Sequence, residues 1–120
     1  MPLNAGEYSI VVKNIESKRK VLQEDYTAAH ADSVLFDCSG AGASLTLTLP
    51  STPSPGDFVK VVGRGLPVYV VYVNFNNEFF KSQASPGTTG IDVNMVEYEF
   101  IYRSSSIGWE SIPDADLLIV

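Results

Sequence analysis

The chain has 120 residues and a mass of 13.0 kDa, which suits one folded domain and leaves no room for a second hydrophobic core. Its 8 basic residues against 14 acidic residues give a formal net charge of -6. Because nucleic acids bind surfaces rich in Lys and Arg, this balance excludes nucleic acid as an expected partner. Hydrophobic residues make up 45% of the chain, so we expect an ordinary core rather than disorder.

The sequence also limits where the protein is made. Cys38 is the only cysteine, so no disulfide can form within the chain. The longest apolar run, Val68–Val73, is far shorter than the roughly 20 residues of a membrane-spanning helix. Met1 is not followed by a basic segment and then an apolar one. We therefore expect no secretory signal, no membrane partner and synthesis in the cytoplasm.

The first part of the chain predicts short strands separated by polar turns. Residues Glu7–Val12 alternate along the chain, which is typical of a strand. The next apolar segment, Val21–Thr27, fits either a strand or one helical turn, and we favour a strand. Val34–Phe36 predicts a further strand. The small residues Ser39–Ala43 then predict a turn, because glycine reaches backbone angles that are closed to other residues.

The most regular pattern in the chain surrounds a proline-rich break. In Leu45–Leu49 leucine and threonine alternate strictly, which predicts a strand with one buried and one solvated face. Three prolines within Pro50–Gly56 remove backbone donors and forbid a helix. The extended pattern resumes at Asp57–Val62. This unit is either a β-hairpin or an arch between two sheets.

The segment Leu66–Val73 is the most β-prone part of the chain, and it follows a turn expected at Gly63–Gly65. Both of its faces are apolar, so we expect it to be covered on both sides, by the fold or by another subunit. Its residues Val68, Val70 and Tyr72 are therefore candidate interface residues.

Short strands are also expected in the last third of the chain, at Glu78–Lys81, Ile91–Met95, Glu97–Arg103 and Gly108–Ile112. The whole chain then holds about eight to ten short strands at the spacing typical of all-β domains. No segment longer than a turn has the periodicity of an amphipathic helix. We expect an all-β fold, a small antiparallel β-sandwich or barrel that is jelly-roll-like. Periodicity does not decide between the sandwich and the barrel.

The C-terminal segment ends in four consecutive apolar residues that should not remain in water: Leu117, Leu118, Ile119 and Val120. They could form a last strand on the chain's own sheet. Alternatively, they could form an arm that adds a strand to a neighbouring subunit, where main-chain hydrogen bonds give affinity. We expect a single β domain over 1–120, with an N-terminal arm at 1–6, a core at 7–112 and a C-terminal arm at 113–120.

No catalytic apparatus emerges from the sequence. His30 is the only histidine and lies in an expected loop, and the chain has no Gly-x-Ser-x-Gly elbow. Cys38 is expected to be a small buried hydrophobe. No His or Cys pair has zinc spacing, and the acidic residues beside the expected turns are too scattered for a calcium site. We expect no catalytic residue, no metal and no cofactor, and hence no enzyme.

Several motifs together resemble a module of bacteriophage virion proteins that occurs in tail fibres, tailspikes and small capsid-associated proteins. The resemblance covers about residues 26–112. Its motifs in this sequence are Asp37–Gly40, Leu45–Pro50, Pro53–Asp57, Val59–Val62, Tyr98–Tyr102 and Gly108–Trp109. Where the family has a Gly-rich strand, this chain has Asn74–Lys81 instead.

The resemblance implies a homo-oligomer, a trimer, with no enzymatic activity and a place in the virion. We expect a capsid decoration or cement protein that binds the major capsid protein on the surface of the assembled head and stabilises it. The alternative is a tail fibre or tail tip component that binds a host surface glycan. In that case Trp109, Tyr102 or Phe80 would be exposed for stacking on sugars.

Overall fold

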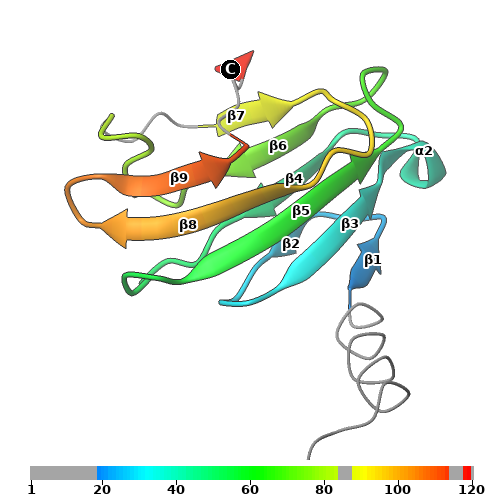
Figure 1. Ribbon diagram of the computed structural model, residues 1–120. Coiled ribbons are helices and arrows are strands. Elements are labelled where there is room, and N and C mark those ends of the chain that lie inside the picture. The colour runs from blue at the N-terminus through cyan, green and yellow to red at the C-terminus, as the bar shows by residue number, and fades with distance from the viewer. Residues whose placement is uncertain (1–18, 84–87, 114–117, 120) are drawn as a thin grey trace, which may run out of the picture.

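The computed structural model describes residues 19–83, 88–113 and 118–119 (Figure 1). The described elements are β1 Lys20–Leu22, β2 Tyr26–Thr27, β3 Ser33–Asp37, α2 Cys38–Ala41, β4 Leu45–Thr48, β5 Phe58–Arg64, β6 Val71–Asn74, β7 Thr88–Ile91, β8 Tyr98–Ser104, β9 Gly108–Ile112 and β10 Leu118–Ile119. The expected all-β class is confirmed. The expected N-terminal arm 1–6 and the strand Glu7–Val12 lie outside the described residues.

The strands form two five-stranded sheets, and neither closes into a barrel. Sheet A has the order β1-β3-β5-β8-β9, and sheet B has the order β10-β7-β6-β4-β2. From β1 to β6 the chain alternates between the two sheets, so that each pair of consecutive strands forms one turn of a coil. The last four strands then complete the sheets through antiparallel pairs, β8 and β9 on one side of sheet A and β7 and β10 on one side of sheet B.

The expectation of an antiparallel, jelly-roll-like topology is matched only in part. The pairs β1–β3, β3–β5, β2–β4 and β4–β6 are parallel. The proline-rich segment explains why: it is an arch, because it joins β4 of sheet B to β5 of sheet A. A chain that crosses to the other sheet at each arch returns to its first sheet running in the original direction. Neighbouring strands of successive coils are therefore parallel.

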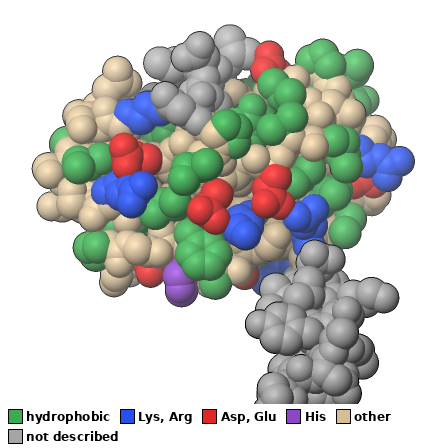
Figure 2. All heavy atoms as spheres, in the orientation of Figure 1, with side chains coloured by type: hydrophobic (Ala, Val, Ile, Leu, Met, Phe, Trp, Pro, Cys, Tyr) green, Lys and Arg blue, Asp and Glu red, His purple; other side chains and the backbone are tan. Residues whose placement is uncertain are grey.

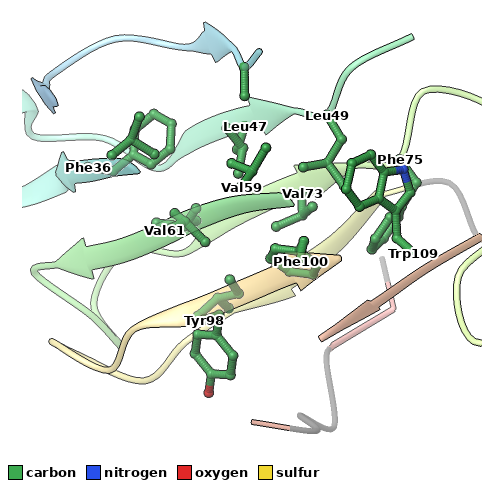
Figure 3. Close-up of a cluster of buried hydrophobic side chains, with 14 of the residues drawn as sticks. Phe36, Leu47, Leu49, Val59, Val61, Val73, Phe75, Tyr98, Phe100 and Trp109 are labelled. Atoms are coloured by element: carbon green, nitrogen blue, oxygen red, sulfur yellow. The ribbon is translucent and has the colours of Figure 1, made fainter. Parts of the chain in front are cut away.

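The core lies between the two sheets and is filled by the alternate residues of the strands (Figure 3). Leu45 and Leu47 of β4 and Tyr98 and Phe100 of β8 are buried, as the alternation predicts. Trp109 of β9 is fully buried as well. Each such side chain contributes about 1.5–3 kcal/mol through the removal of apolar surface from water, so the inward faces supply most of the stability.

The segment Ser39–Ala43 was expected to be a turn. Its first three residues belong to the single helical turn α2, Cys38–Ala41. The carboxylate of Asp37 caps it by accepting the backbone N–H of Gly40 at 3.0 Å, the usual role of Asp at this position. Gly42 ends it with a φ of 68°, a left-handed conformation that glycine adopts without strain. Cys38 in this turn is buried, which confirms the expectation for that residue.

Two expected strands are wrong in their extent. Only Val71–Val73 of the expected strand Leu66–Val73 lies in a strand, β6, and the preceding residues form a turn. Pro67 has no N–H to give to a sheet, and the N–H groups of Gly65 and Leu66 are taken by the side chain of Asn94. Val21–Thr27 is not one strand, because a bend divides it between β1 of sheet A and β2 of sheet B.

The segment between β5 and β8 also differs from expectation. Glu78–Lys81 contributes only isolated bridges at Phe80 instead of a strand. The expected strand Ile91–Met95 is a turn after its first residue, while β7 begins at Thr88, where a loop was expected. Apolar composition alone does not distinguish a short strand from an apolar turn, because periodicity needs more residues than these segments contain.

A tight turn at Phe80–Gln83 holds two residues in a left-handed conformation. Phe80 and Gln83 exchange both backbone hydrogen bonds, at 3.1 and 2.9 Å. The two residues between them, Lys81 and Ser82, have φ angles of 50° and 65°. This is the pattern of a type I′ turn, in which glycine is preferred at the second central position.

Replacing Ser82 with glycine is therefore expected to stabilise the protein by about 0.5–1 kcal/mol, because a left-handed serine costs more than the added freedom of glycine in the unfolded chain. Ser105 lies in the β8–β9 turn without a positive φ, so Ser105→Gly is the matched control and should not stabilise. Urea denaturation of both variants measures the effect. A loss of stability in Ser82→Gly equal to that of the control would contradict the turn assignment.

Candidate functional site

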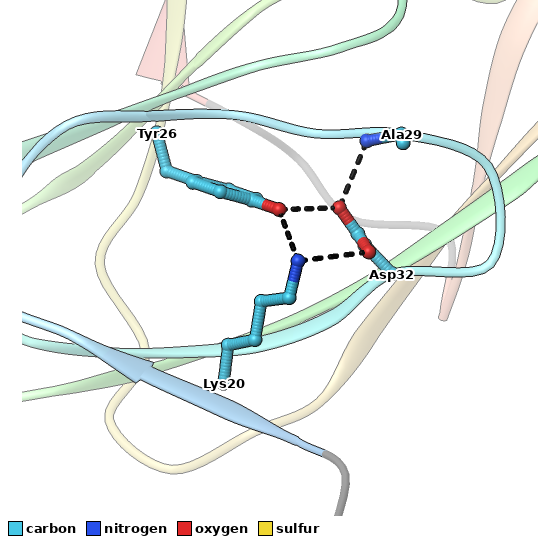
Figure 4. A network of polar contacts seen from close by, with 4 residues as sticks. All are labelled: Lys20, Tyr26, Ala29 and Asp32. Carbon is cyan, nitrogen blue, oxygen red and sulfur yellow. Dashed lines mark hydrogen bonds and ion pairs between the residues drawn. The ribbon is translucent and has the colours of Figure 1, made fainter.

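A polar cluster joins the first coil of the fold to β3 (Figure 4). The hydroxyl of Tyr26 donates to the carboxylate of Asp32 at 2.7 Å and accepts a hydrogen bond from the Lys20 ammonium. The same carboxylate accepts the backbone N–H of Ala29 at 2.9 Å. Since Lys20 lies in sheet A and Tyr26 in sheet B, the cluster joins the two sheets.

The cluster changes the acid–base properties of its members. Partial burial acts to raise the pKa of Asp32, but the hydrogen bonds from Ala29 and Tyr26 and the charge of Lys20 outweigh it, and the pKa lies below its ordinary value. The hydrogen bond with Tyr26 is the main cause that raises the pKa of Lys20. A lysine whose ammonium form is favoured in this way is a poor nucleophile or base, so the cluster has the character of a structural clamp.

This clamp predicts a dependence of stability on acid. Because the pKa of Asp32 is lowered in the folded state, its contribution is present above the unfolded pKa of about 3.9 and is lost as the pH falls through the folded value. We expect Asp32→Asn to lower the free energy of unfolding at neutral pH by about 1 kcal/mol or less, because the pair is partly exposed. The difference from the wild type should shrink near pH 3, measured by urea denaturation at both pH values. A difference that is unchanged in acid would contradict the assignment.

The other candidates for chemistry have structural surroundings. His30 lies in a loop, its ring meets that of Phe58 edge-on at 5.1 Å, and its Nδ1 accepts the backbone N–H of Phe58 at 3.2 Å. The carboxylate of Asp57 is 3.4 Å from the same nitrogen. Burial raises the pKa of the Cys38 thiol, which disfavours the reactive thiolate. The Nδ1 of His30 is thus occupied by the backbone N–H of Phe58, and the side chain of Cys38 is buried.

Among the residues that the structure describes, no three His, Cys, Asp or Glu side chains come together in a way that could hold a metal ion. Within the same residues, no helix has the length and apolar character needed to cross a membrane.

The aromatic residues considered for glycan stacking are in the core. Trp109 is 0% exposed, Tyr102 5% and Phe80 6%. The ring of Tyr102 meets that of Trp109 edge-on at 5.4 Å, and its hydroxyl donates to the carboxylate of Glu78 at 2.8 Å. The expectation that these rings would be exposed on a tail component is therefore wrong, because packing between the sheets and the β6–β7 segment covers them.

The exposed apolar residues of greatest interest lie in two neighbouring turns at one end of the molecule. Val68 in the β5–β6 turn is 84% exposed, and Met95 and Val93 in the β7–β8 turn are 54% and 45% exposed. Figure 1 shows both turns at the same end of the sheets, and Figure 2 shows hydrophobic side chains on the surface there. We call Val68, Val93 and Met95 the apolar tip.

Hydrogen bonds fix the two turns of the apolar tip to each other. The Asn94 side-chain oxygen accepts the N–H groups of Gly65 at 2.9 Å and Leu66 at 3.3 Å. The N–H of Met95 donates to the carbonyl of Gly63 at 2.8 Å. Met95 has a φ of 60°, a conformation rare for a residue with a long side chain. The β7–β8 turn is thus held in a defined shape that presents apolar side chains to solvent.

The β5–β6 turn is held in the same manner. The N–H of Tyr69 donates to the carbonyl of Gly65 at 3.1 Å, and the N–H of Val70 donates to the hydroxyl of Ser44 at 3.0 Å. Val68 lies inside the turn that the hydrogen bond between Gly65 and Tyr69 closes. An apolar side chain on a rigid turn loses little conformational entropy when it is covered by a partner, so this geometry favours binding.

The candidate interface residues from the sequence are thus distributed over different surfaces. Val68 is in the apolar tip, and Tyr72 is half-buried on the outward side of β6. Val70 is half-buried in the turn before β6. Val93 and Met95 were missed, because their segment was expected to be a strand. The hydrogen bonds of Asn94 that define the turn join residues about thirty positions apart and leave no local sequence signal.

The C-terminal candidates are described only in part. The backbone of Leu118 and Ile119 forms β10, which pairs antiparallel with β7 in the register Leu118↔Gly90 and Ile119↔Thr89. This pairing matches the alternative of a last strand on the chain's own sheet. Leu117 and Val120 lie outside the described residues.

The sequence matches no protein-family model, and the search of curated proteins finds no match. The candidate site is therefore defined by its own geometry.

Proposed function

We propose that this protein is a non-catalytic structural protein of a bacteriophage virion, a decoration or cement protein that binds the assembled head. Its partners in this proposal are the major capsid protein and further copies of itself, in a homotrimer. The observation that supports it most is the apolar tip, where Val68 is 84% exposed on a turn fixed by hydrogen bonds. The resemblance to virion modules supplies the context.

A cement protein acts by mass action. It binds the assembled lattice but not the free subunits, so it stabilises the lattice in proportion to occupancy. A standard protein interface buries roughly 1,600 Å² in total, and a few central residues supply most of the binding energy. Val68, Val93 and Met95 suit this role, because they are apolar, clustered and held on a rigid frame.

We also propose that the two facing sheets act as one small β-sandwich that carries the tip. The parallel coils stack β1, β3 and β5 in one sheet and β2, β4 and β6 in the other. The tip turn between β5 and β6 therefore joins both sheets and is anchored in the core by Leu66 and Val71, both of which are buried. A force applied to the apolar tip would be transmitted to the whole domain.

The tail component with a glycan-binding aromatic face is not retained as the preferred function. Trp109, Tyr102 and Phe80 are buried, which leaves that alternative without the rings on which it was based. A glycan array on the purified protein still distinguishes the two, since a specific sugar ligand favours the tail.

The location of the protein on purified particles tests the proposal. Electron cryomicroscopy of virions, with and without the protein, should show additional density on the outer surface of the head and more heat-stable heads when the protein is present. Density at the tail instead, or the absence of the protein from purified particles, would reject the decoration role.

A further inference from the structure

We propose that His30 is a proton-sensitive latch between the loop that joins β2 to β3 and the first residue of β5, Phe58. In this proposal the neutral imidazole holds the backbone N–H of Phe58. The protonated imidazole gives up that bond and donates instead to the carboxylate of Asp57. The inference rests on the contacts of these residues alone and is independent of the proposed function.

The contacts of the β2–β3 loop define the neutral state of the latch. The Nδ1 atom of His30 accepts the backbone N–H of Phe58 at 3.2 Å. This bond requires a lone pair on Nδ1 and therefore a neutral ring with its proton on Nε2. The carbonyl of Phe58 accepts the N–H of Ala31 at 2.8 Å. Two consecutive loop residues thus hold both backbone groups of Phe58 at the start of β5.

The loop has a defined shape around this contact. Ala31 has a φ of 68°, a conformation that is uncommon for a residue with a Cβ atom. The N–H of Asp32 donates to the carbonyl of Ala29 at 3.1 Å. The ring of His30 meets that of Phe58 edge-on at 5.1 Å. The imidazole is thereby kept beside Phe58 and beside the residue that precedes it in the chain.

A second partner for the same ring nitrogen is the carboxylate of Asp57. One of its oxygens is 3.4 Å from Nδ1 of His30. Its other oxygen accepts the backbone N–H of Ser54 at 2.9 Å, which fixes the carboxylate on the proline-rich arch. A carboxylate accepts hydrogen bonds and cannot bind a nitrogen that presents a lone pair. The neutral imidazole therefore binds Phe58 and not Asp57.

Protonation reverses this choice. Histidine is the side chain that changes its charge between about pH 5 and 8. When the ring of His30 takes up a proton, Nδ1 becomes a donor, and the N–H of Phe58 loses its acceptor. The carboxylate of Asp57 then gains a charged donor. A hydrogen bond between a charged N–H and a carboxylate is about twice as strong as a neutral one, so this bond offsets the loss of the other.

The other charged groups of this region are bound elsewhere. The carboxylate of Asp32, two residues after His30 in the same loop, accepts hydrogen bonds from the polar cluster described above. Lys60 of β5 forms an ion pair with Glu99 at 3.8 Å. Among the residues that the structure describes, the ion pair of His30 is the one with Asp57. The proton on His30 therefore acts between Phe58 and Asp57.

Nuclear magnetic resonance of the isotope-labelled full chain tests this inference. At about pH 8 we expect a scalar coupling across the hydrogen bond between the amide nitrogen of Phe58 and Nδ1 of His30, and at about pH 5 we expect its loss. The protection of the Phe58 amide against hydrogen exchange, corrected for the intrinsic rate at each pH, should fall by about fivefold or more. The amide of Lys60 in the same strand donates to the carbonyl of Asp32 at 2.9 Å, which does not titrate, so its protection should be unchanged.

Two substitutions test the two partners separately. His30→Asn supplies an amide oxygen that accepts at every pH, so the protection of Phe58 should no longer depend on pH. Asp57→Asn removes the charge but keeps an oxygen for the N–H of Ser54. In that variant the protonated ring has no anion to bind, and the Ala31 amide should lose protection by about fivefold or more at about pH 5. In the wild type the Ala31 amide should stay protected.

Four results would overturn the inference. They are a coupling that persists in acid or is absent at about pH 8, an equal loss of protection at Phe58 and Lys60, a pH-dependent Phe58 amide in His30→Asn, and an Ala31 amide that stays protected in acid in Asp57→Asn. Equal loss at Phe58 and Lys60 would mean that acid loosens the whole strand. Binding to phage heads is a separate measurement, so its failure would reject the decoration role and leave this inference standing.

Discussion

Replacement of Gly108 by alanine is expected to lower the free energy of unfolding by about 2–5 kcal/mol, the sum of a left-handed alanine and an overpacked contact. Gly108 begins β9 with a φ of 75°, and a Cβ atom there would lie 1.8 Å from the carbonyl oxygen of Phe79. The backbone of Phe79 cannot move away freely, because its carbonyl accepts the N–H of Trp109 at 2.8 Å. The added methyl group must therefore separate β9 from the segment that covers it.

Gly42 provides the matched control. It also has a left-handed backbone, with a φ of 68°, but a Cβ atom there would have no neighbour within 4 Å. Gly42→Ala should therefore cost only the conformational term, about 1 kcal/mol. Thermal or urea denaturation of both variants measures the difference. Equal losses for the two glycines would show that the close approach of Phe79 to β9 is wrong.

The second large effect is expected on binding to the phage head. A double variant, Val68→Asp with Met95→Asp, should weaken binding to heads by about 100-fold or more, because each charge would have to lose its water in an apolar contact. The fold should be retained, since both side chains are exposed and aspartate tolerates the left-handed backbone of Met95 better than most residues.

The control for this variant carries the same added charge at exposed positions outside the apolar tip. Ile107 in the β8–β9 turn is 37% exposed, and Ile112 at the end of β9 is 54% exposed. Figure 1 shows the β8–β9 turn far from the apolar tip. Ile107→Asp with Ile112→Asp should bind heads like the wild type. If both double variants lose binding equally, net charge rather than the apolar tip controls attachment.

The buried faces of the strands could be predicted from the sequence alone. The alternation in Leu45–Leu49 and in Tyr98–Tyr102 shows which side chains enter the core, and those leucines, Tyr98, Phe100 and Tyr102 are buried. The identity of neighbouring strands could not be predicted, because alternation fixes the face of a strand but not its partner. The strands of successive coils are parallel because each arch crosses from one sheet to the other. Contacts between distant segments decide where the chain makes these crossings.

The apolar tip could be predicted only in part for a similar reason. The β-branched residues of Leu66–Val73 favour a strand locally. Asn94 overrides this preference by binding the N–H groups of Gly65 and Leu66, and Val68 is left exposed in a turn. Val68 could be chosen as a candidate because it is apolar, whether its segment forms a strand or a turn. The positions of Val93 and Met95 in a turn depend on the long-range contact of Asn94.

The function that we propose for this protein is adhesion to an assembled phage head. The most direct test mixes the purified protein with phage heads that lack it, and measures by cosedimentation how much protein is bound per head. We predict saturable binding with a fixed number of copies per head, and binding that is strongest on fully expanded heads. Protein that stays in the supernatant at every concentration would contradict the account.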